Sequence, residues 1–195
     1  MSLGELLRFG RSIRHNLPFL TTLQHVLTAA VSEVVQEDVV PVYNFFCLYN
    51  NLGVCEVHMD APSAKWTPDL CIEHTAPWPL NISPVSPWPV DLNLSRDEDW
   101  QTAIKDQNEF EPHCMNEGDA VVFAGSSQWH FRPRIPRVRH QNFCHLAFLH
   151  FLPRGSGALV TPQLWPDLLD LPEIRDVCDA THAPTDGFLF QQPLD

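Results

Sequence analysis

The chain has 195 residues, of which 44% are hydrophobic and 18% charged, so it can fill the core of one domain of ordinary size. Its formal net charge of −12 disfavours binding to the phosphate backbone of nucleic acids. No apolar run reaches the roughly 18 residues of a membrane span, and the N-terminus lacks the apolar core of a signal peptide. We therefore predict a single domain, residues 1–195, in a cytoplasmic protein with no membrane or nucleic-acid partner.

The predicted elements begin with a helix and continue as strands. Apolar residues recur at helical spacing over residues 17–37, with Pro18 in the first turn. From residue 39 onward, β-branched and aromatic residues favour strands. Strands are predicted at 39–50, 54–60, 69–73, 79–82, 120–123 and 141–152, with short helices near 97–105 and after 154. This order favours a mainly β jelly roll or barrel whose N-terminal helix packs on the outside of a sheet.

The six cysteines form no Cys-x-x-Cys pair and no regular framework. Four of them lie in apolar, strand-like runs. This pattern predicts free, mostly buried thiols in a reducing compartment.

Residues of the types that bind metals lie two positions apart at the end of a predicted strand. His58 and Asp60 would face the same side of that strand. A distant histidine, His130, follows an apolar strand and a turn. Two histidines and one carboxylate form the facial triad of non-haem iron(II) oxygenases, which leaves coordination positions open. By itself the pair is equally typical of exposed polar residues at a strand end, and ten histidines make a chance partner easy to find.

These motifs together resemble a known family. The segment from about Val39 to Pro153 is similar to the iron(II)- and 2-oxoglutarate-dependent oxygenase superfamily, in particular to its prolyl-hydroxylase-like small hydroxylases. The resemblance is carried by residues 49–53 leading to 58–60, and by 65–70, 78–80, 118–130 and 148–151. It implies a double-stranded β-helix, in which His58, Asp60 and His130 bind iron(II) and carry catalysis with 2-oxoglutarate and O2. The carboxylate of Asp60 implies hydroxylation or another oxidation rather than halogenation.

The cosubstrate needs a cation for its far carboxylate, and arginine suits a two-pronged contact. The family places an arginine or lysine about ten residues after the third metal ligand. Arg139, nine residues after His130, is the first candidate, and Arg132 is the second. Tyr49 could add a hydroxyl group. The alternative interpretation is that the arginines form a solvated basic loop and that Tyr49 belongs to the core.

We therefore predict a 2-oxoglutarate-dependent dioxygenase that hydroxylates or otherwise oxidises a small molecule such as an amino acid, a peptide or a natural-product intermediate. Two alternatives stay open: a cupin-type metal oxygenase that does not use 2-oxoglutarate, and a non-catalytic jelly-roll binding domain. Three further histidines in predicted strands, His74, His145 and His150, are interpreted as hydrogen-bonded core or supporting groups. The sequence identifies neither the substrate nor the oligomeric state.

Overall fold

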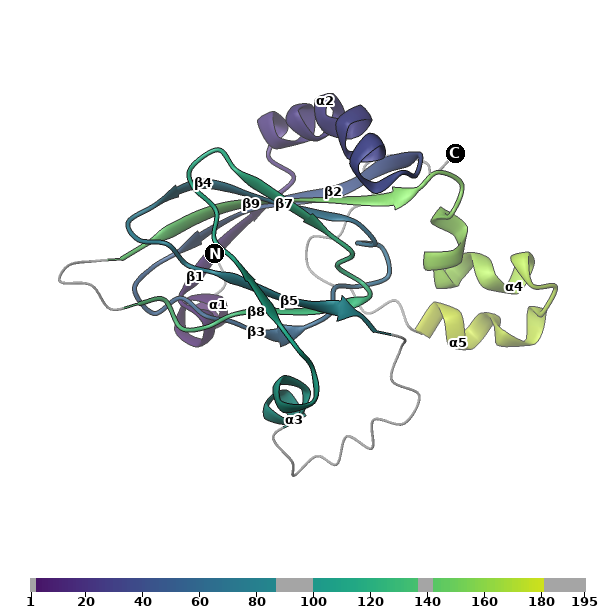
Figure 1. Ribbon diagram of the computed structural model, residues 1–195. Coiled ribbons are helices and arrows are strands. Elements are labelled where there is room, and N and C mark those ends of the chain that lie inside the picture. The colour runs from purple at the N-terminus through teal and green to yellow at the C-terminus, as the bar shows by residue number, and fades with distance from the viewer. Residues whose placement is uncertain (1–2, 87–99, 137–141, 181–195) are drawn as a thin grey trace.

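The computed structural model describes residues 3–86, 100–136 and 142–180, and its core is a pair of antiparallel sheets facing each other (Figure 1). The larger sheet has the order β1–β2–β9–β4–β7 and the smaller sheet the order β3–β8–β5–β6. The strands are β1 (Arg11–His15), β2 (Val39–Tyr49), β3 (Cys55–His58), β4 (Thr67–His74), β5 (Leu80–Val85), β6 (Glu111–His113), β7 (Ala120–Phe123), β8 (Gln128–Arg132) and β9 (Cys144–Pro153). The helices are α1 (Leu3–Phe9), α2 (Pro18–Val35), α3 (Trp100–Gln107), α4 (Trp165–Leu168) and α5 (Arg175–Ala180), with 3-10 turns at Gly157–Val160, Pro162–Leu164 and Pro172–Ile174.

The path of the chain defines the fold class. From β2 onward, most connections carry the chain from one sheet to the other, and every strand pair is antiparallel. This is the jelly roll, or double-stranded β-helix, that the sequence predicted. Side chains on the facing sides of the two sheets share one interior, and a site that draws residues from both sheets has to lie there.

Helix α2 covers the outer face of the larger sheet, as predicted (Figure 1). It begins at Pro18, whose missing N–H costs nothing in the first turn of a helix. Its buried Gln24 donates hydrogen bonds to the carbonyl oxygens of Tyr43 (3.0 Å) and His150 (2.8 Å) and accepts one from Asn44 (2.9 Å). These bonds tie α2 to both β2 and β9 behind the interior. Within the described ranges, no helix is long and apolar enough to cross a membrane.

The sequence patterns did not predict three of the strands. β1 and β8 are five residues long and rich in polar side chains, and β6 has three residues. Sequence patterns recognise strands that bury an apolar face over several residues, whereas these strands acquire their order by pairing with a longer neighbour. Along β1, for example, Arg11 pairs with Tyr49 of β2.

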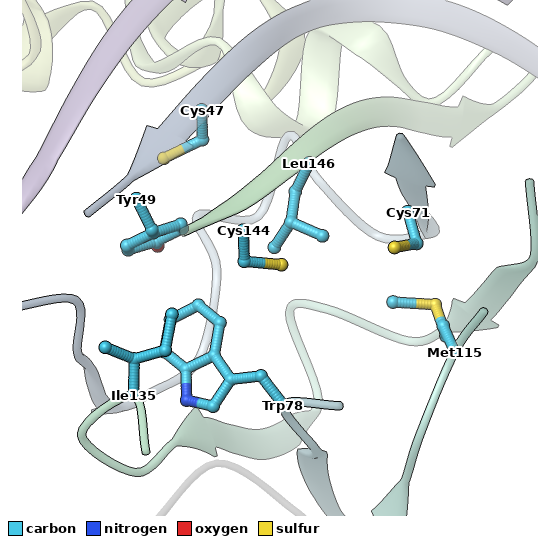
Figure 2. Close-up of a cluster of buried hydrophobic side chains, with 8 residues drawn as sticks. All are labelled: Cys47, Tyr49, Cys71, Trp78, Met115, Ile135, Cys144 and Leu146. Carbon is cyan, nitrogen blue, oxygen red and sulfur yellow. The ribbon is translucent and has the colours of Figure 1, made fainter. Parts of the chain in front are cut away.

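An apolar cluster fills one end of the interior (Figure 2). Its residues come from β2, β4, β9 and the connecting loops: Cys47, Tyr49, Cys71, Trp78, Met115, Ile135, Cys144 and Leu146. The rings of Tyr49 and Trp78 meet edge to face, 4.8 Å between centroids, which is a favourable arrangement. All six cysteines are free and four are buried, so the prediction of free, mostly buried thiols is confirmed, and the reducing compartment stays a prediction.

Candidate metal centre

Strand β3 ends at the first pair of candidate ligands. His58 is its last residue, and Asp60 lies two positions beyond, outside the strand. The backbone N–H of Asp60 donates to the carbonyl oxygen of Gly125 (2.8 Å), which turns the carboxylate back toward the imidazole. Oδ1 of Asp60 lies 3.5 Å from Nε2 of His58. The two residues therefore meet as predicted, although a loop contact rather than strand alternation positions the carboxylate.

The third candidate lies on the neighbouring strand. His130 of β8 stands directly opposite His58 in the register of the smaller sheet. Its Nε2 is 3.6 Å from Oδ1 of Asp60, and its side chain is 6% exposed, against 41% for His58. The ring of Phe123 packs edge-on against it at 4.7 Å. Because His58 is the open member of the group, the centre is reached from its side.

Hydrogen bonds leave one free acceptor atom on each of these three side chains. Nδ1 of His58 lies 2.8 Å from the carbonyl oxygen of Glu56, and Nδ1 of His130 lies 2.9 Å from that of Gln128. A carbonyl oxygen can only accept, so both Nδ1 atoms carry a proton, and each Nε2 is the atom that can bind a metal once it has no proton of its own. Burial lowers the pKa of the His58 imidazole, but Cys55 and Asp60 outweigh it and hold that pKa well above its ordinary value, so a metal at this position would displace a proton from Nε2.

The carboxylate is oriented in the same way. Thr67 donates to Oδ2 of Asp60 (2.9 Å) and leaves Oδ1 for the centre. Burial alone would raise the pKa of this carboxyl, but the imidazoles of His130 and His58 hold it well below its usual range, so it is ionised at neutral pH. The three ligand atoms lie within 4.8 Å of one another. Two neutral imidazoles and one carboxylate with converging lone pairs fit a divalent transition metal.

Gly125 is required beside this group. A Cβ atom at this position would lie 2.2 Å from Oδ2 of Asp60 and 2.5 Å from the hydroxyl oxygen of Thr67. Both side chains are already held in place by their hydrogen bond, so neither can move away without turning the carboxylate.

We therefore expect Gly125→Ala to weaken metal binding by about 10- to 100-fold, as the loss of an orienting contact does at other metal sites. Calorimetric titration of the protein with iron(II) under nitrogen measures the change. Gly118→Ala is the control: it adds a methyl group to a left-handed residue with open space around it, so it strains the backbone but is expected to leave metal affinity unchanged. Equal affinities of the Gly125 variant and the wild type would contradict the prediction.

A basic group lies farther inside the barrel. Arg132, two residues past His130 on β8, has a side chain 2% exposed; it pairs with the fully buried Asp69 of β4 at 2.7 Å and also donates to the carbonyl oxygen of Trp78. Its Nε is buried and has no partner among the described residues, and the same is true of Oδ1 of Asp69. Arg11 of β1 approaches from the other sheet and donates to the hydroxyl of Tyr49 (3.2 Å).

The structure places two of the three residues that were predicted to bind the cosubstrate. Arg132 and Tyr49 lie in the wall of the same cavity as the three metal-ligand candidates. Arg139 lies outside the described residues, so its role stays a prediction. Sequence reasoning missed Arg11, because it faces the interior only through the pairing of β1 with β2. A polar five-residue strand near the N-terminus carries no pattern that would have shown this.

The cavity itself measures about 40 Å3 and has both polar and apolar walls. The metal-ligand candidates line it together with Thr67 and His150, and so do Arg11, Tyr49, Cys55 and Arg132. Four apolar side chains complete the lining: Phe45, Leu80, Phe123 and Phe148. The cavity therefore places arginine side chains and apolar rings in one space with the candidate metal centre.

The comparisons with known proteins bear on the fold. The chain is similar to the non-haem alpha-ketoglutarate-dependent epimerase SnoN from nogalamycin biosynthesis, with a TM-score of 0.52 and 10% identity over 78% of this chain and 69% of that one. An oxidoreductase of the 2OG-Fe(II) oxygenase family from Burkholderia pseudomallei aligns with a TM-score of 0.47 and 9% identity over 74% of each chain. AviO1 from Streptomyces viridochromogenes aligns with a TM-score of 0.44 and 14% identity. The aligned part covers 64% of this chain and 56% of AviO1.

No protein-family model matches the chain, and no curated protein sequence matches it significantly. At these identities the similarity to SnoN shows the shared double-stranded β-helix alone. The assignment of an activity has to rest on the residues inside the barrel.

Proposed function

We propose that the protein is a non-haem iron(II), 2-oxoglutarate-dependent oxygenase that oxidises a small molecule. The convergence of three free lone pairs, from His58, Asp60 and His130, carries the proposal. A triad of this composition occupies one face of the metal and leaves the remaining positions to ligands that the protein does not supply. Iron(II) held there would supply the activation of O2 that oxidation of an unreactive C–H bond requires.

The cavity favours 2-oxoglutarate as the second reactant. Along a strand, two residues span about 6.6 Å, so the cation of Arg132 follows the ligand His130 at about the length of a five-carbon dicarboxylate. The free Nε of Arg132, the hydroxyl of Tyr49 and the guanidinium of Arg11 would receive the far carboxylate. The cavity as it stands holds only a few water molecules, so the ligand must displace side chains of its walls when it binds.

The protein's own groups prepare the site rather than react. Backbone carbonyl oxygens hold both imidazoles in the tautomer that presents Nε2, and Thr67 holds the carboxylate. The phenyl rings of Phe45, Phe123 and Phe148 line the same cavity, where they would limit the access of water to the metal centre. A larger hollow of about 420 Å3, lined by Ile82 and Gln128 beside His130 and by residues 109–113, would receive the substrate.

One observation favours the second candidate, a cupin-type metal oxygenase that does not use 2-oxoglutarate. The charge of Arg132 is already neutralised by Asp69. A cation with a buried carboxylate partner attracts a second carboxylate less strongly. In the second candidate, Arg132 would therefore stabilise the fold and would not bind a cosubstrate. The third candidate, a non-catalytic jelly roll, requires that the three converging acceptors bind no catalytic metal.

An anaerobic titration separates the three candidates. The iron(II)-loaded protein is titrated with 2-oxoglutarate while the visible absorption is recorded for the weak charge-transfer band of a chelated 2-oxo acid. We expect a saturable band that succinate, which lacks the 2-oxo group, does not produce. Iron binding without a band would favour the cupin-type enzyme, and failure to bind iron would leave a jelly roll without a catalytic metal. Arg139→Ala in the same titration tests the arginine that lies outside the described residues.

A further inference from the structure

His150 is a buried histidine of β9 with one ring nitrogen that no contact among the described residues explains. The residue is 2% exposed, and its ring stacks on that of Tyr43 at 4.0 Å and 12°. The ring also forms a hydrogen bond with the backbone of Tyr43. Nδ1, by contrast, is shielded from solvent and has no partner among the described residues. The sequence-based interpretation of a hydrogen-bonded supporting histidine therefore holds for one ring nitrogen and not for the other.

The bond to Tyr43 decides which ring nitrogen carries the proton. The nitrogen that faces a backbone carbonyl oxygen has to donate, because that oxygen can only accept. Burial lowers the pKa of the His150 imidazole to about 4, against smaller opposing effects of Asp60 and of the bond to Tyr43, so the ring is neutral at neutral pH and has a single N–H. Nδ1 therefore carries a lone pair. A buried acceptor without a partner is costly, and where native proteins keep one, a bound molecule often completes it.

The register of the larger sheet places this acceptor beside the candidate metal centre. Asp69 of β4 pairs with Phe148 of β9. Two positions farther along each of these antiparallel strands, Thr67 lies across from His150. Thr67 holds the carboxylate of Asp60 and lines the same cavity as His150. A molecule bound between the metal and the larger sheet would therefore meet the His150 ring.

Once a metal is bound, His150 is the one histidine in the described cavity lining that keeps an unshared lone pair. Nδ1 of His58 and Nδ1 of His130 each face a backbone carbonyl oxygen, and their Nε2 atoms would bind the metal. The guanidinium groups of Arg11 and Arg132, which line the same cavity, have only N–H donors. A ligand therefore needs an O–H or N–H donor to satisfy the wall at His150.

2-Oxoglutarate does not supply such a donor. At neutral pH both of its carboxyl groups are ionised, and its 2-oxo group has no proton, so each of its polar atoms is an acceptor. An acceptor oxygen would be repelled by the lone pair of Nδ1 rather than bound by it. The donor has to belong to another molecule at the metal centre, which is either the substrate or a water molecule.

We infer that Nδ1 of His150 accepts a hydrogen bond from the substrate, so that the molecule oxidised carries a hydroxyl or amino group that lies beside the metal centre. The inference rests on the function proposed above and names the class of its substrate. Stacking on Tyr43 fixes the plane of the ring, and the bond from Gln24 to the His150 carbonyl oxygen fixes its backbone. The acceptor is thus oriented before the substrate binds, which lowers the entropic cost of the contact.

A matched pair of small acids tests the inference by binding. Glycolate carries a hydroxyl group next to the carboxylate through which it binds a metal, and methoxyacetate is the same acid with the hydroxyl proton replaced by a methyl group. We expect His150→Phe to lower the affinity of the iron(II)-loaded protein for glycolate about five- to tenfold, because a hydrogen bond to a buried acceptor is lost. The affinity for methoxyacetate is expected to stay unchanged. Anaerobic calorimetry without 2-oxoglutarate measures both affinities.

Two variants show whether the acceptor itself is responsible. His150→Asn places an amide oxygen, which is also an acceptor, near the position of Nδ1 and is expected to restore most of the affinity for glycolate. His145→Phe is the matched control, because His145 lies on the same strand outside the cavity lining, with Glu73 at 3.7 Å, and it is expected to bind both acids as the wild type does. The melting temperature of His150→Phe is expected to stay close to that of the wild type, because the carbonyl oxygen of Tyr43 keeps its bond from Gln24.

Nitrogen NMR gives a readout that a merely structural role would not change. The protein is labelled with isotope-enriched histidine and loaded with zinc(II), which is diamagnetic. The Nδ1 resonance of His150 is identified by its absence in His150→Phe. We expect this resonance to shift upfield when glycolate binds, as an acceptor nitrogen does when it gains a hydrogen bond, and to keep its position with methoxyacetate.

The opposite results are distinct from one another. Equal changes in the affinities for the two acids in His150→Phe would assign the lone pair to a water molecule or to the fold, and would overturn the inference. A wild type that does not bind glycolate, or a loss of affinity for iron(II) or 2-oxoglutarate in His150→Phe, would overturn it as well. A wild type that binds iron(II) but gives no charge-transfer band with 2-oxoglutarate would overturn the proposed function instead, and the two acids would still decide whether His150 receives a donor.

Discussion

Asp60→Ala is expected to lower the affinity for iron(II) by about 100-fold or more, because loss of a direct ligand should exceed the 10- to 100-fold effect of losing a supporting contact. The substitution removes the only carboxylate of the candidate centre and leaves two neutral imidazoles, which repay less of the dehydration of a divalent cation. His130→Ala should have a similar effect, because the side chain of His130 is the most buried of the three candidate ligands. Anaerobic titration with iron(II), followed by the 2-oxoglutarate titration, measures both losses.

Two controls make this result specific. Asp60→Asn keeps the shape of the side chain and its contact with Thr67, so retention of metal affinity in this variant would show that charge matters less than geometry. Asp106→Ala removes the same unit of charge from the exposed surface of α3 and is expected to change nothing. Iron affinity in Asp60→Ala equal to that of the wild type would remove the triad, and the proposed function would go with it.

The candidate ligands could be predicted because their signal is local. His58 and Asp60 are close in sequence, and His130 follows an apolar strand between two turns. The long strands that frame the interior could be predicted for the same reason, since β2 and β9 bury apolar side chains over ten residues or more. In each case, neighbouring residues along the chain carry the information.

The supporting residues depend on contacts between distant segments, which no local pattern records. Thr67 orients Asp60 only because β4 lies beside the loop after β3, and Gly125 is needed only because that loop contacts the turn before β8. Arg132 was a candidate from sequence spacing, but its pairing with Asp69 across the barrel was not foreseeable. Because Asp69 neutralises the charge of Arg132, this arginine can stabilise the fold as well as attract a ligand.

The buried pair of Arg132 and Asp69 leads to the second large prediction. Arg132→Met leaves the carboxylate of Asp69 buried and uncompensated, which typically costs about 3–5 kcal/mol of folding free energy. Burial already raises the pKa of Asp69 in spite of Arg132, and loss of the cation raises it further. When the pKa of a carboxyl is higher in the folded than in the unfolded state, the free energy of unfolding falls as the pH rises from the unfolded-state pKa to the folded-state pKa. The variant is therefore expected to regain stability under mildly acidic conditions, as measured by urea denaturation at two pH values.

The double variant Asp69→Leu/Arg132→Met separates structure from binding. Replacing both partners of a buried ion pair by apolar side chains is often neutral, so this variant is expected to recover most of the stability lost in Arg132→Met. If it folds and loses only a few-fold in 2-oxoglutarate affinity, the main contact of the far carboxylate is Arg11, whose partner Glu5 is 32% exposed and whose charge is less completely neutralised.

Arg11→Met should then weaken 2-oxoglutarate binding about tenfold or more, at a cost of about 1–2 kcal/mol in stability, because a partly buried ion pair with Glu5 and one hydrogen bond to Tyr49 are lost. The opposite order, with the double variant losing all binding and Arg11→Met losing none, would assign the carboxylate to Arg132 despite its partner. In the first case the two arginines have separate roles: the buried pair of Arg132 and Asp69 holds the two sheets together, and Arg11 binds the far carboxylate of the ligand. In the second case Arg132 does both.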